Sequence, residues 1–312
     1  MEEKEKLIFI DWEQRSSSLG ALMTNLDAIT ELEKQELKDL LIEEKTGLNA
    51  NGNKAKWTDT KIARVKTLHK KEKGDLPSGA ITHLDEVFRN VFWKRRRFLA
   101  NKQLEKGTLQ EHDAISDLRD YEKLIGNSIY MEKNGFYKSN GYTNGTEDVV
   151  TDDHVWDTKC SFDLQSFDEK DEPTTDNVWQ MRDYCWRNNK KSGYVAYVLV
   201  NNPVHQLINE KNRLFYAMGN PPDDDEDYIE ALCQLERNMI FDIPKFQKDY
   251  PNYTFLNKEL NFSIPLQFRV KKFKVEVTDE DILNIKLRVT MGRKYLVEKE
   301  LAHYEKAKQF NK

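Results

Sequence analysis

The segment Tyr194-Val-Ala-Tyr-Val-Leu-Val200 constrains the fold more than any other stretch of this chain. It is a nearly unbroken apolar run of strand length, and such runs are typical of a strand that is buried on both faces of a sheet. Patterns typical of helices come before and after it, together with one hairpin pattern. The order of these patterns predicts an α/β fold with a mixed central sheet flanked by helices.

Apolar periodicity and turn residues indicate where the elements begin and end. The expected helices span residues 30–45 (with Thr30 as N-cap), 56–71, 80–103, 108–124, 175–189 and 205–240, and a strand followed by a helix is expected over 275–310. Gly107 is expected to separate the third helix from the fourth, and Gly193 to cap the fifth. The acidic run 221–227 indicates a solvated loop that interrupts the sixth helix.

A hairpin is predicted from two short apolar runs, 145–150 and 154–160, with the polar residues 151–153 as the turn. Residues that face each other in a hairpin have position numbers with a constant sum. If the turn is centred between Asp152 and Asp153, Asp148 lies directly opposite Asp157. Their Cβ atoms are then roughly 5 Å apart.

Two carboxylates in that position point to metal chemistry. Like charges directly opposite each other destabilise a sheet, and a divalent cation such as Mg²⁺ between them removes the penalty. Lys159 projects from the same face as Asp157 because it is two residues further along the strand. An ammonium there can help to activate a water or stabilise charge on a phosphate. The alternative is an ordinary surface hairpin whose charges face water.

Composition sets broader bounds on the chain. Its 312 residues suffice for one large domain or two modest ones, and no apolar run approaches the roughly 20 residues that span a bilayer. The three cysteines are scattered without a Cys-x-x-Cys pair, which indicates a reducing cytoplasm and argues against zinc or iron–sulfur sites. With a net charge of −5, any contact with nucleic acid must come from a local basic patch.

Three further groups of residues are candidates for function. Gln180 and Tyr184 share a helix face because they are four residues apart. Glu111 is expected near the start of a helix, where an acid interacts favourably with the helix dipole. The cluster Lys94-Arg-Arg-Arg97, which includes Arg95 and Arg96, indicates either a phosphate-binding patch or a solvated helix face.

Taken together, these elements resemble a known family. The motifs, in order, are Gly107-x-x-x-Glu111, Gly145-x-x-Asp148, Asp157-x-Lys159, Gln180-x-x-x-Tyr184 and an apolar strand ending in Asn202-Pro203. This order is similar to that of the PD-(D/E)XK nuclease superfamily and its restriction-endonuclease-like fold. Within it, the chain most resembles the RecB-like group of lambda-type and YqaJ-type viral recombination exonucleases, especially those in phages of Bacteroides-like hosts. The motifs cover about residues 100–205.

The resemblance implies a role for each matching residue. Glu111, Asp148 and Asp157 match acids that hold Mg²⁺ or Mn²⁺, and Lys159 matches the catalytic lysine. Gln180 and Tyr184 match the helix motif that supports the site and positions DNA. Glu147 departs from the family pattern, because relatives often have proline before the aspartate.

A looser match concerns binding of the DNA end. Arg15 with Ser17 and Ser18 resembles a segment that binds the 5′-phosphate in lambda-type enzymes, although the arginine and serines are closer together here. We therefore expect a helical region over residues 1–75 that could bind DNA ends, followed by a nuclease core with a C-terminal extension over 76–312.

The resemblance implies a Mg²⁺-dependent 5′→3′ exonuclease that acts on ends of double-stranded DNA in phage recombination. Such an enzyme works beside a single-strand annealing protein in the bacterial cytoplasm, and a homo-oligomer is possible because relatives form rings around DNA. Two alternatives stay open. One is an endonuclease or junction-processing nuclease of the same fold, and the other is a DNA-binding protein with a vestigial site.

Overall fold

The computed structural model describes residues 7–24, 31–97, 101–257 and 261–310. The chain divides into two compact units. Unit 1 holds the described residues up to Arg96, residues 141–143 and the C-terminal part from Asp279, and unit 2 holds residues 97–140 and 144–278. The sequence-based division sets its boundary after residue 75 and groups the C-terminal part with the core.

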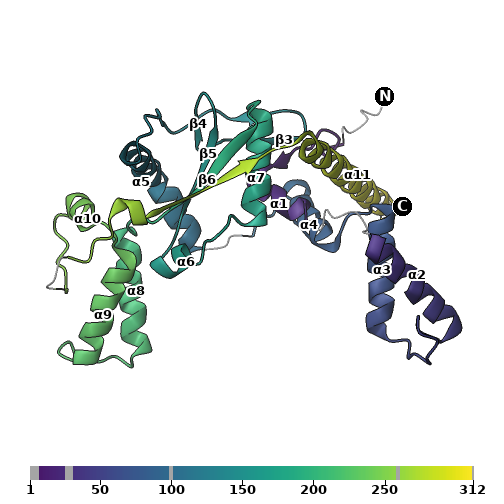
Figure 1. The fold of residues 1–312 in the computed structure, drawn as a ribbon, viewed down its shortest axis with the longest axis horizontal. Helices are drawn as coiled ribbons and strands as arrows, with labels where there is room; N and C mark the ends of the chain where they lie inside the picture. The colour runs from purple at the N-terminus through teal and green to yellow at the C-terminus, as the bar shows by residue number, and fades with distance from the viewer. Residues whose placement is uncertain (1–6, 25–30, 98–100, 258–260, 311–312) are drawn as a thin grey trace. The chain divides into compact units, whose positions relative to one another are not determined.

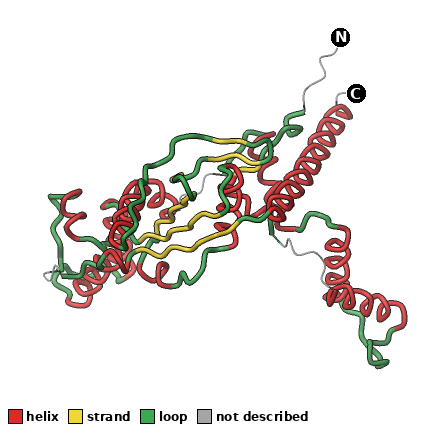
Figure 2. The backbone as a smooth tube through the Cα atoms, turned by 45° about the horizontal axis from the view of Figure 1, so that its top comes forward, coloured by secondary structure: helices red, strands yellow, loops and turns green. Residues whose placement is uncertain are grey.

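A four-stranded sheet forms the centre of unit 2, and the prediction of a mixed central sheet is confirmed. Its strands, in spatial order, are β4 (Val149–Val150), β5 (Val155–Cys160), β6 (Ser192–Val198) and β7 (Val270–Glu276). β5 is antiparallel to β4 and parallel to β6, and β6 is antiparallel to β7. These strands lie side by side in Figure 2. The predicted buried strand is therefore β6, an interior strand of the sheet.

Two helices cover the two faces of this sheet (Figure 1). On one face, Ala114, Ile115 and Leu118 of α5 (Lys102–Leu124) belong to a buried cluster with Trp156 and Ala196. On the other face, the members of the buried cluster are Met181, Tyr184 and Cys185 of α7 (Thr175–Arg187), with Val155, Val195 and Tyr197. Neighbouring strand residues enter opposite clusters because side chains alternate across a strand. The prediction of a sheet flanked by helices is confirmed.

The other elements of unit 2 lie outside the four-stranded sheet and the two helices that cover it. They are β2 (Lys138–Ser139), which pairs with β3 (Thr143–Gly145), α6 (Leu164–Asp168), α8 (Val204–Ala217), α9 (Glu226–Met239), α10 (Ile243–Asp249) and the 3₁₀ helix η2 (Leu266–Phe268). Asp225, in the expected acidic loop, caps α9 by accepting a hydrogen bond from the backbone N–H of Tyr228 at 2.9 Å. Leu207, Ile243 and Phe246 form part of a separate apolar cluster.

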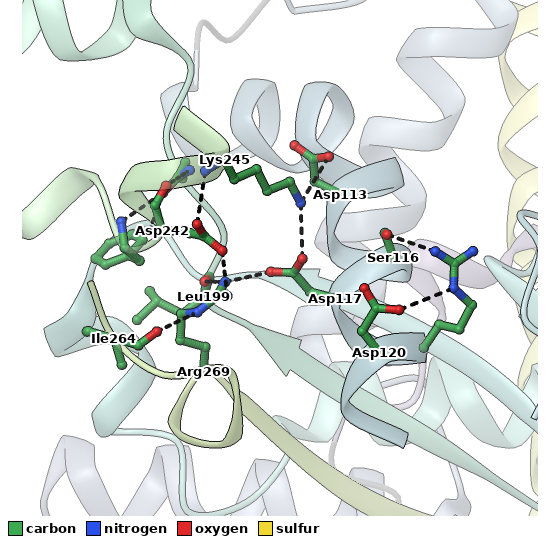
Figure 3. A network of polar contacts seen from close by, with 12 residues as sticks. Asp113, Ser116, Asp117, Asp120, Leu199, Asp242, Lys245, Ile264 and Arg269 are labelled. Atoms are coloured by element: carbon green, nitrogen blue, oxygen red, sulfur yellow. Dashed lines mark hydrogen bonds and ion pairs between the residues drawn. The ribbon is translucent and has the colours of Figure 1, made fainter. Parts of the chain in front are cut away.

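A polar network ties α5 to the far end of the sheet (Figure 3). Arg269, just before β7, forms ion pairs with Asp117 at 2.6 Å and with Asp242 at 3.0 Å. Lys245 of α10 contacts Asp117 at 3.0 Å and Asp113 at 3.2 Å. Arg269 and Asp117 are nearly buried, and separating them would leave an uncompensated charge. The network therefore holds α5 against α10 and the start of β7.

Unit 1 is mostly helical, as expected for the N-terminal part. Its elements are β1 (Gln14–Arg15), the 3₁₀ helix η1 (Ser16–Ser18), α1 (Leu19–Leu22), α2 (Glu31–Thr46), α3 (Asp59–Lys73), α4 (Ser78–Phe92) and α11 (Asp279–Phe310). Leu37 of α2 packs with Val65 and Leu68 of α3. None of the helices among the described residues is long and apolar enough to cross a membrane.

Three predicted boundaries are wrong. The helix expected over 80–103 ends at Phe92, and Lys94 adopts a positive φ of 53°. Gly107 does not separate two helices, because α5 begins at Lys102 behind the N-cap Asn101 and continues through it. Gly193 lies in β6 and does not cap α7, which ends at Arg187.

The predicted hairpin strand and the predicted N-cap of α2 remain. The first strand of the hairpin is split into β3 and β4, with residues 146–148 between them outside both strands. Thr30, the expected N-cap of α2, lies outside the described residues.

Candidate active site

The hairpin has the predicted register. Val149 pairs with Trp156, and Val150 with Val155, and both pairs have the same position sum as Asp148 and Asp157. The turn closes through Thr151, whose backbone N–H and side-chain hydroxyl each donate to the His154 carbonyl at 2.9 Å. Asp148 and Asp157 are the next positions after the Val149–Trp156 pair, so this register places them opposite each other.

Asp148 is held by the residue next to Asp157. Its Oδ2 accepts hydrogen bonds from the backbone N–H of Thr158 at 2.6 Å and from the Thr158 hydroxyl at 2.8 Å. Burial and the charge of Asp157 raise the pKa of Asp148 to about 7, against the opposing effect of these hydrogen bonds. Burial also raises the pKa of Asp157, which is 1% exposed. The two carboxylates thus share an environment that disfavours negative charge.

Lys159 partly balances this charge. Its Nζ lies 2.8 Å from Asp157 Oδ2 and donates to Gln180 Oε1 at 3.1 Å. Burial alone lowers the pKa of the lysine, but the charges of Asp157 and Asp148 bring it above its ordinary value. Lys159 is therefore an ammonium at neutral pH.

The helix motif continues the chain of contacts from Lys159. Gln180 Nε2 donates to the Tyr184 hydroxyl at 2.7 Å, and this hydroxyl donates to the Thr146 carbonyl at 3.2 Å. Burial raises the pKa of Tyr184, so the hydroxyl keeps its proton. The structure therefore brings Asp148, Asp157, Lys159, Gln180 and Tyr184 together.

Glu111 approaches the cluster from α5, but not from the start of a helix. It lies in the interior of α5, so the expected interaction with the helix dipole is wrong. Its carboxylate forms an ion pair with Lys133 at 2.7 Å, and its charge helps to raise the pKa of Asp157. Glu111 thus acts on Asp157 through its charge, while its direct partner is Lys133.

The fit of a metal ion rests on the two aspartates. Asp157 Oδ2 is buried and faces the Lys159 ammonium without a hydrogen bond of good geometry. Carboxylate oxygens are the ligands that Mg²⁺ prefers, and a cation would relieve the repulsion between Asp148 and Asp157. Within the described residues, no three His, Cys, Asp or Glu side chains gather closely enough to hold a metal ion. The role of Glu111 as a third ligand stays a prediction.

Sequence reasoning missed two contacts of the site and one buried lysine of α5. Thr158 is the direct partner of Asp148, and Lys133 is that of Glu111. Lys106 is a fully buried lysine of α5 that donates to the Ser161 carbonyl at 2.6 Å, just after β5, and burial lowers its pKa to about 7. The position of Thr158 between Asp157 and Lys159 was a usable signal, whereas the other two contacts depend on residues far apart in the chain.

The predicted DNA-binding residues belong to unit 1. Arg15 and Ser17 are exposed, and the Ser18 hydroxyl accepts a hydrogen bond from Gln14 at 2.9 Å. Arg95 and Arg96 are exposed in the segment after α4. The basic cluster therefore does not lie on a helix. The interpretation of this cluster as a solvated helix face is wrong. A role of these residues in DNA binding stays a prediction.

Comparison with known proteins identifies the fold. No protein-family model matches the chain, and no curated protein matches it. Among solved structures, a phage-related exonuclease from Haemophilus somnus 129PT aligns with a TM-score of 0.52 and 18% identity, over 92% of this chain and 94% of that one. The fold is that of a phage-related exonuclease. An alkaline exonuclease from Laribacter hongkongensis in complex with dAMP aligns with a TM-score of 0.48 and 9% identity, over 97% and 96% of the two chains.

Proposed function

We propose that this protein is a metal-dependent DNA exonuclease. The observation that carries the proposal is the cluster of Asp148, Asp157 and Lys159 on one hairpin, where two carboxylates with raised pKa values lie beside an ammonium. Hydrolysis of a phosphodiester needs a neutralised phosphate, an activated water and a stabilised leaving oxygen. The likeness in fold to a phage-related exonuclease supports this chemistry.

Each residue of the cluster has a part in the proposed reaction. Asp148 and Asp157 would hold Mg²⁺ or Mn²⁺, with Glu111 as a further acid from α5. When bound, such an ion lowers the pKa of a water and neutralises charge on the phosphate. Lys159, protonated because of its carboxylate neighbours, stabilises negative charge that develops on the phosphate.

Gln180 and Tyr184 keep this lysine and the hairpin in place. Gln180 Oε1 accepts from Lys159 Nζ and restricts the direction in which the ammonium points. Tyr184 holds Gln180 at one side and the Thr146 carbonyl at the other. Because catalysis depends on the placement of reacting groups, these contacts would support the rate without touching the scissile bond.

The proposal includes the finer role implied by the resemblance of the sequence. The enzyme degrades double-stranded DNA from its ends in the 5′→3′ direction, in the cytoplasm of a bacterial host, during phage recombination. A single-strand annealing protein is its proposed partner, and a homo-oligomer is its proposed assembly. The predicted 5′-phosphate contacts, Arg15, Ser17 and Ser18, would bind the DNA end.

Digestion of end-labelled linear duplex DNA tests the proposal. The duplex carries its label at either the 5′ or the 3′ end, and a closed circle of the same sequence serves as the control. We expect Mg²⁺-dependent release of the 5′ label as mononucleotides, no reaction in EDTA and an intact circle. Cleavage of the circle would indicate an endonuclease of the same fold. Binding without cleavage of either substrate would indicate a DNA-binding protein with a vestigial site.

A further inference from the structure

One face of α7 contacts the catalytic hairpin at three points. Gln180, Tyr184 and Arg187 follow each other at spacings of four and three residues, so they share a helix face. Gln180 contacts Lys159 on β5, Tyr184 contacts the Thr146 carbonyl, and Arg187 donates to the Gly145 carbonyl at 2.9 Å. Arg187 thus adds a third contact between this face of α7 and the segment that leads into Asp148.

The Arg187 side chain is 1% exposed and has partners on several sides. Its guanidinium forms ion pairs with Glu147 at 3.0 Å and with Asp183 at 3.2 Å, and both acids are fully buried. It also donates to the Lys138 carbonyl at 3.0 Å and lies over the Tyr184 ring, 5.2 Å from its centroid. Only the planar fork of an arginine can serve so many acceptors at once.

The segment that receives these contacts lacks a strand partner of its own. Residues 146–148 lie between β3 and β4, outside both. Side chains of α7 donate to the backbone carbonyls on either side of this segment's start, because Arg187 donates to Gly145 and Tyr184 donates to Thr146. Glu147 accepts a second contact from Asn134 Nδ2 at 3.3 Å, and Asn134 N–H donates to the Asp148 carbonyl at 2.7 Å.

We propose that Arg187 is a positioning residue for Asp148. By holding Gly145 and Glu147 against α7, Arg187 fixes the backbone from which the Asp148 carboxylate reaches Thr158. Glu147 is the buried counter-ion that this arrangement needs. The inference rests on the proposed function, in which Asp148 holds the metal ion.

Mn²⁺ binding and nuclease activity of full-length variants test the inference. Arg187→Met removes the donors but keeps an apolar stem, Arg187→Lys keeps the charge but not the fork, and Arg182→Met is the matched control. Arg182 lies on the same helix, with its guanidinium over the Trp179 ring at 4.5 Å. The readouts are Mn²⁺ affinity by calorimetry and the Mg²⁺ concentration that gives half-maximal cleavage.

We expect Arg187→Met to weaken Mn²⁺ binding by roughly tenfold or more, as loss of residues that orient metal ligands commonly does. The Mg²⁺ requirement should rise in parallel, Arg187→Lys should restore part of the affinity, and Arg182→Met should match the wild type. A purely structural role would lower the unfolding temperature and leave Mn²⁺ affinity and Mg²⁺ requirement unchanged. That result would overturn the inference.

A second variant keeps the test decisive if Arg187→Met does not fold. Glu147→Gln preserves the size of the side chain and removes one ion pair with Arg187, so it should weaken Mn²⁺ binding in the same direction. Unchanged Mn²⁺ affinity in a folded Glu147→Gln variant would then overturn the inference. A wild type that neither binds Mn²⁺ nor cleaves DNA would instead overturn the proposed function, and with it the inference.

Discussion

Partial burial and the charge of Asp157 raise the pKa of the Asp148 carboxyl group to about 7. An unfolded aspartate has a pKa of about 4. Between these values the folded protein binds more protons than the unfolded chain, so the free energy of unfolding falls as pH rises from about 4 to about 7. The site therefore destabilises the metal-free protein above neutral pH.

Replacing Asp148 with asparagine should remove this penalty. The neutral amide has no charge to bury. We therefore expect the free energy of unfolding of Asp148→Asn to be about 1–3 kcal/mol higher than that of the wild type near pH 8 without metal. The difference should shrink toward about pH 4. Urea unfolding at several pH values measures it, with Asp152→Asn in the exposed turn as the control. Equal stability of Asp148→Asn and the wild type near pH 8 would refute the raised pKa.

The affinity for metal should follow the same titration. A metal ion competes with the proton on a carboxylate, so Mn²⁺ affinity should increase as pH rises from about 5 through the pKa of Asp148 at about 7 to about 8. Above that range the affinity should level off, because Asp148 is already ionised. Calorimetry across this range gives the profile, and a flat profile would show that Asp148 does not bind the ion.

Much of the site was predictable at the residue scale, because its members are local. Asp148, Asp157 and Lys159 lie on one hairpin, and a constant position sum suffices to pair the two acids. Gln180 and Tyr184 required only helical spacing. Arg187 with Glu147, and Lys133 with Glu111, could not be paired from the sequence. An ion pair between distant residues leaves no periodic signal in a single chain.

At the scale of elements, two glycines show that the sequence pattern does not decide whether a glycine ends a helix. Gly107 and Gly193 both indicated helix ends, yet one lies inside α5 and the other inside β6. A Cβ on Gly193 would lie 2.6 Å from the Val155 carbonyl and 2.3 Å from Met181 Sδ, so glycine there permits α7 to pack closely on the sheet. A Cβ on Gly107 would meet nothing within 4 Å. Only the tertiary structure shows that glycine is required by close packing at position 193 but not at position 107.

Alanine at these two positions should therefore have opposite effects. We expect Gly193→Ala to lower the free energy of unfolding by about 1–3 kcal/mol, because overpacking forces neighbours to shift. Gly107→Ala should raise it by about 0.5–1 kcal/mol, because alanine favours an open helix position. Urea unfolding of both variants makes the comparison. A stabilising Gly193→Ala would contradict the close approach of α7 to β6.

At the scale of the whole molecule, the division into two units depends on contacts between the chain ends. Glu300 of α11 accepts a hydrogen bond from the Ile8 N–H at 2.9 Å, Arg293 donates to the Trp12 carbonyl at 2.6 Å, and Tyr295 donates to Asp85 at 2.6 Å. These partners are more than 200 residues apart. Local periodicity predicts where helices lie, but it does not predict hydrogen bonds between residues so far apart. The helices of unit 1 were therefore predictable from the sequence, whereas the packing of the C-terminal helix with the N-terminal ones was not.

The measurement that tests the central claim most directly is the nuclease activity of Lys159→Met on linear duplex DNA with Mg²⁺. Methionine keeps the length of the side chain and removes the ammonium that pairs with Asp157. The matched control is Lys274→Met, a change of an exposed lysine on β7 of the same sheet. We predict that the wild type and Lys274→Met digest the DNA, while folded Lys159→Met loses at least about a hundredfold in rate, as expected for a lost transition-state contact. Full activity of Lys159→Met would contradict the assignment of this hairpin as the active site.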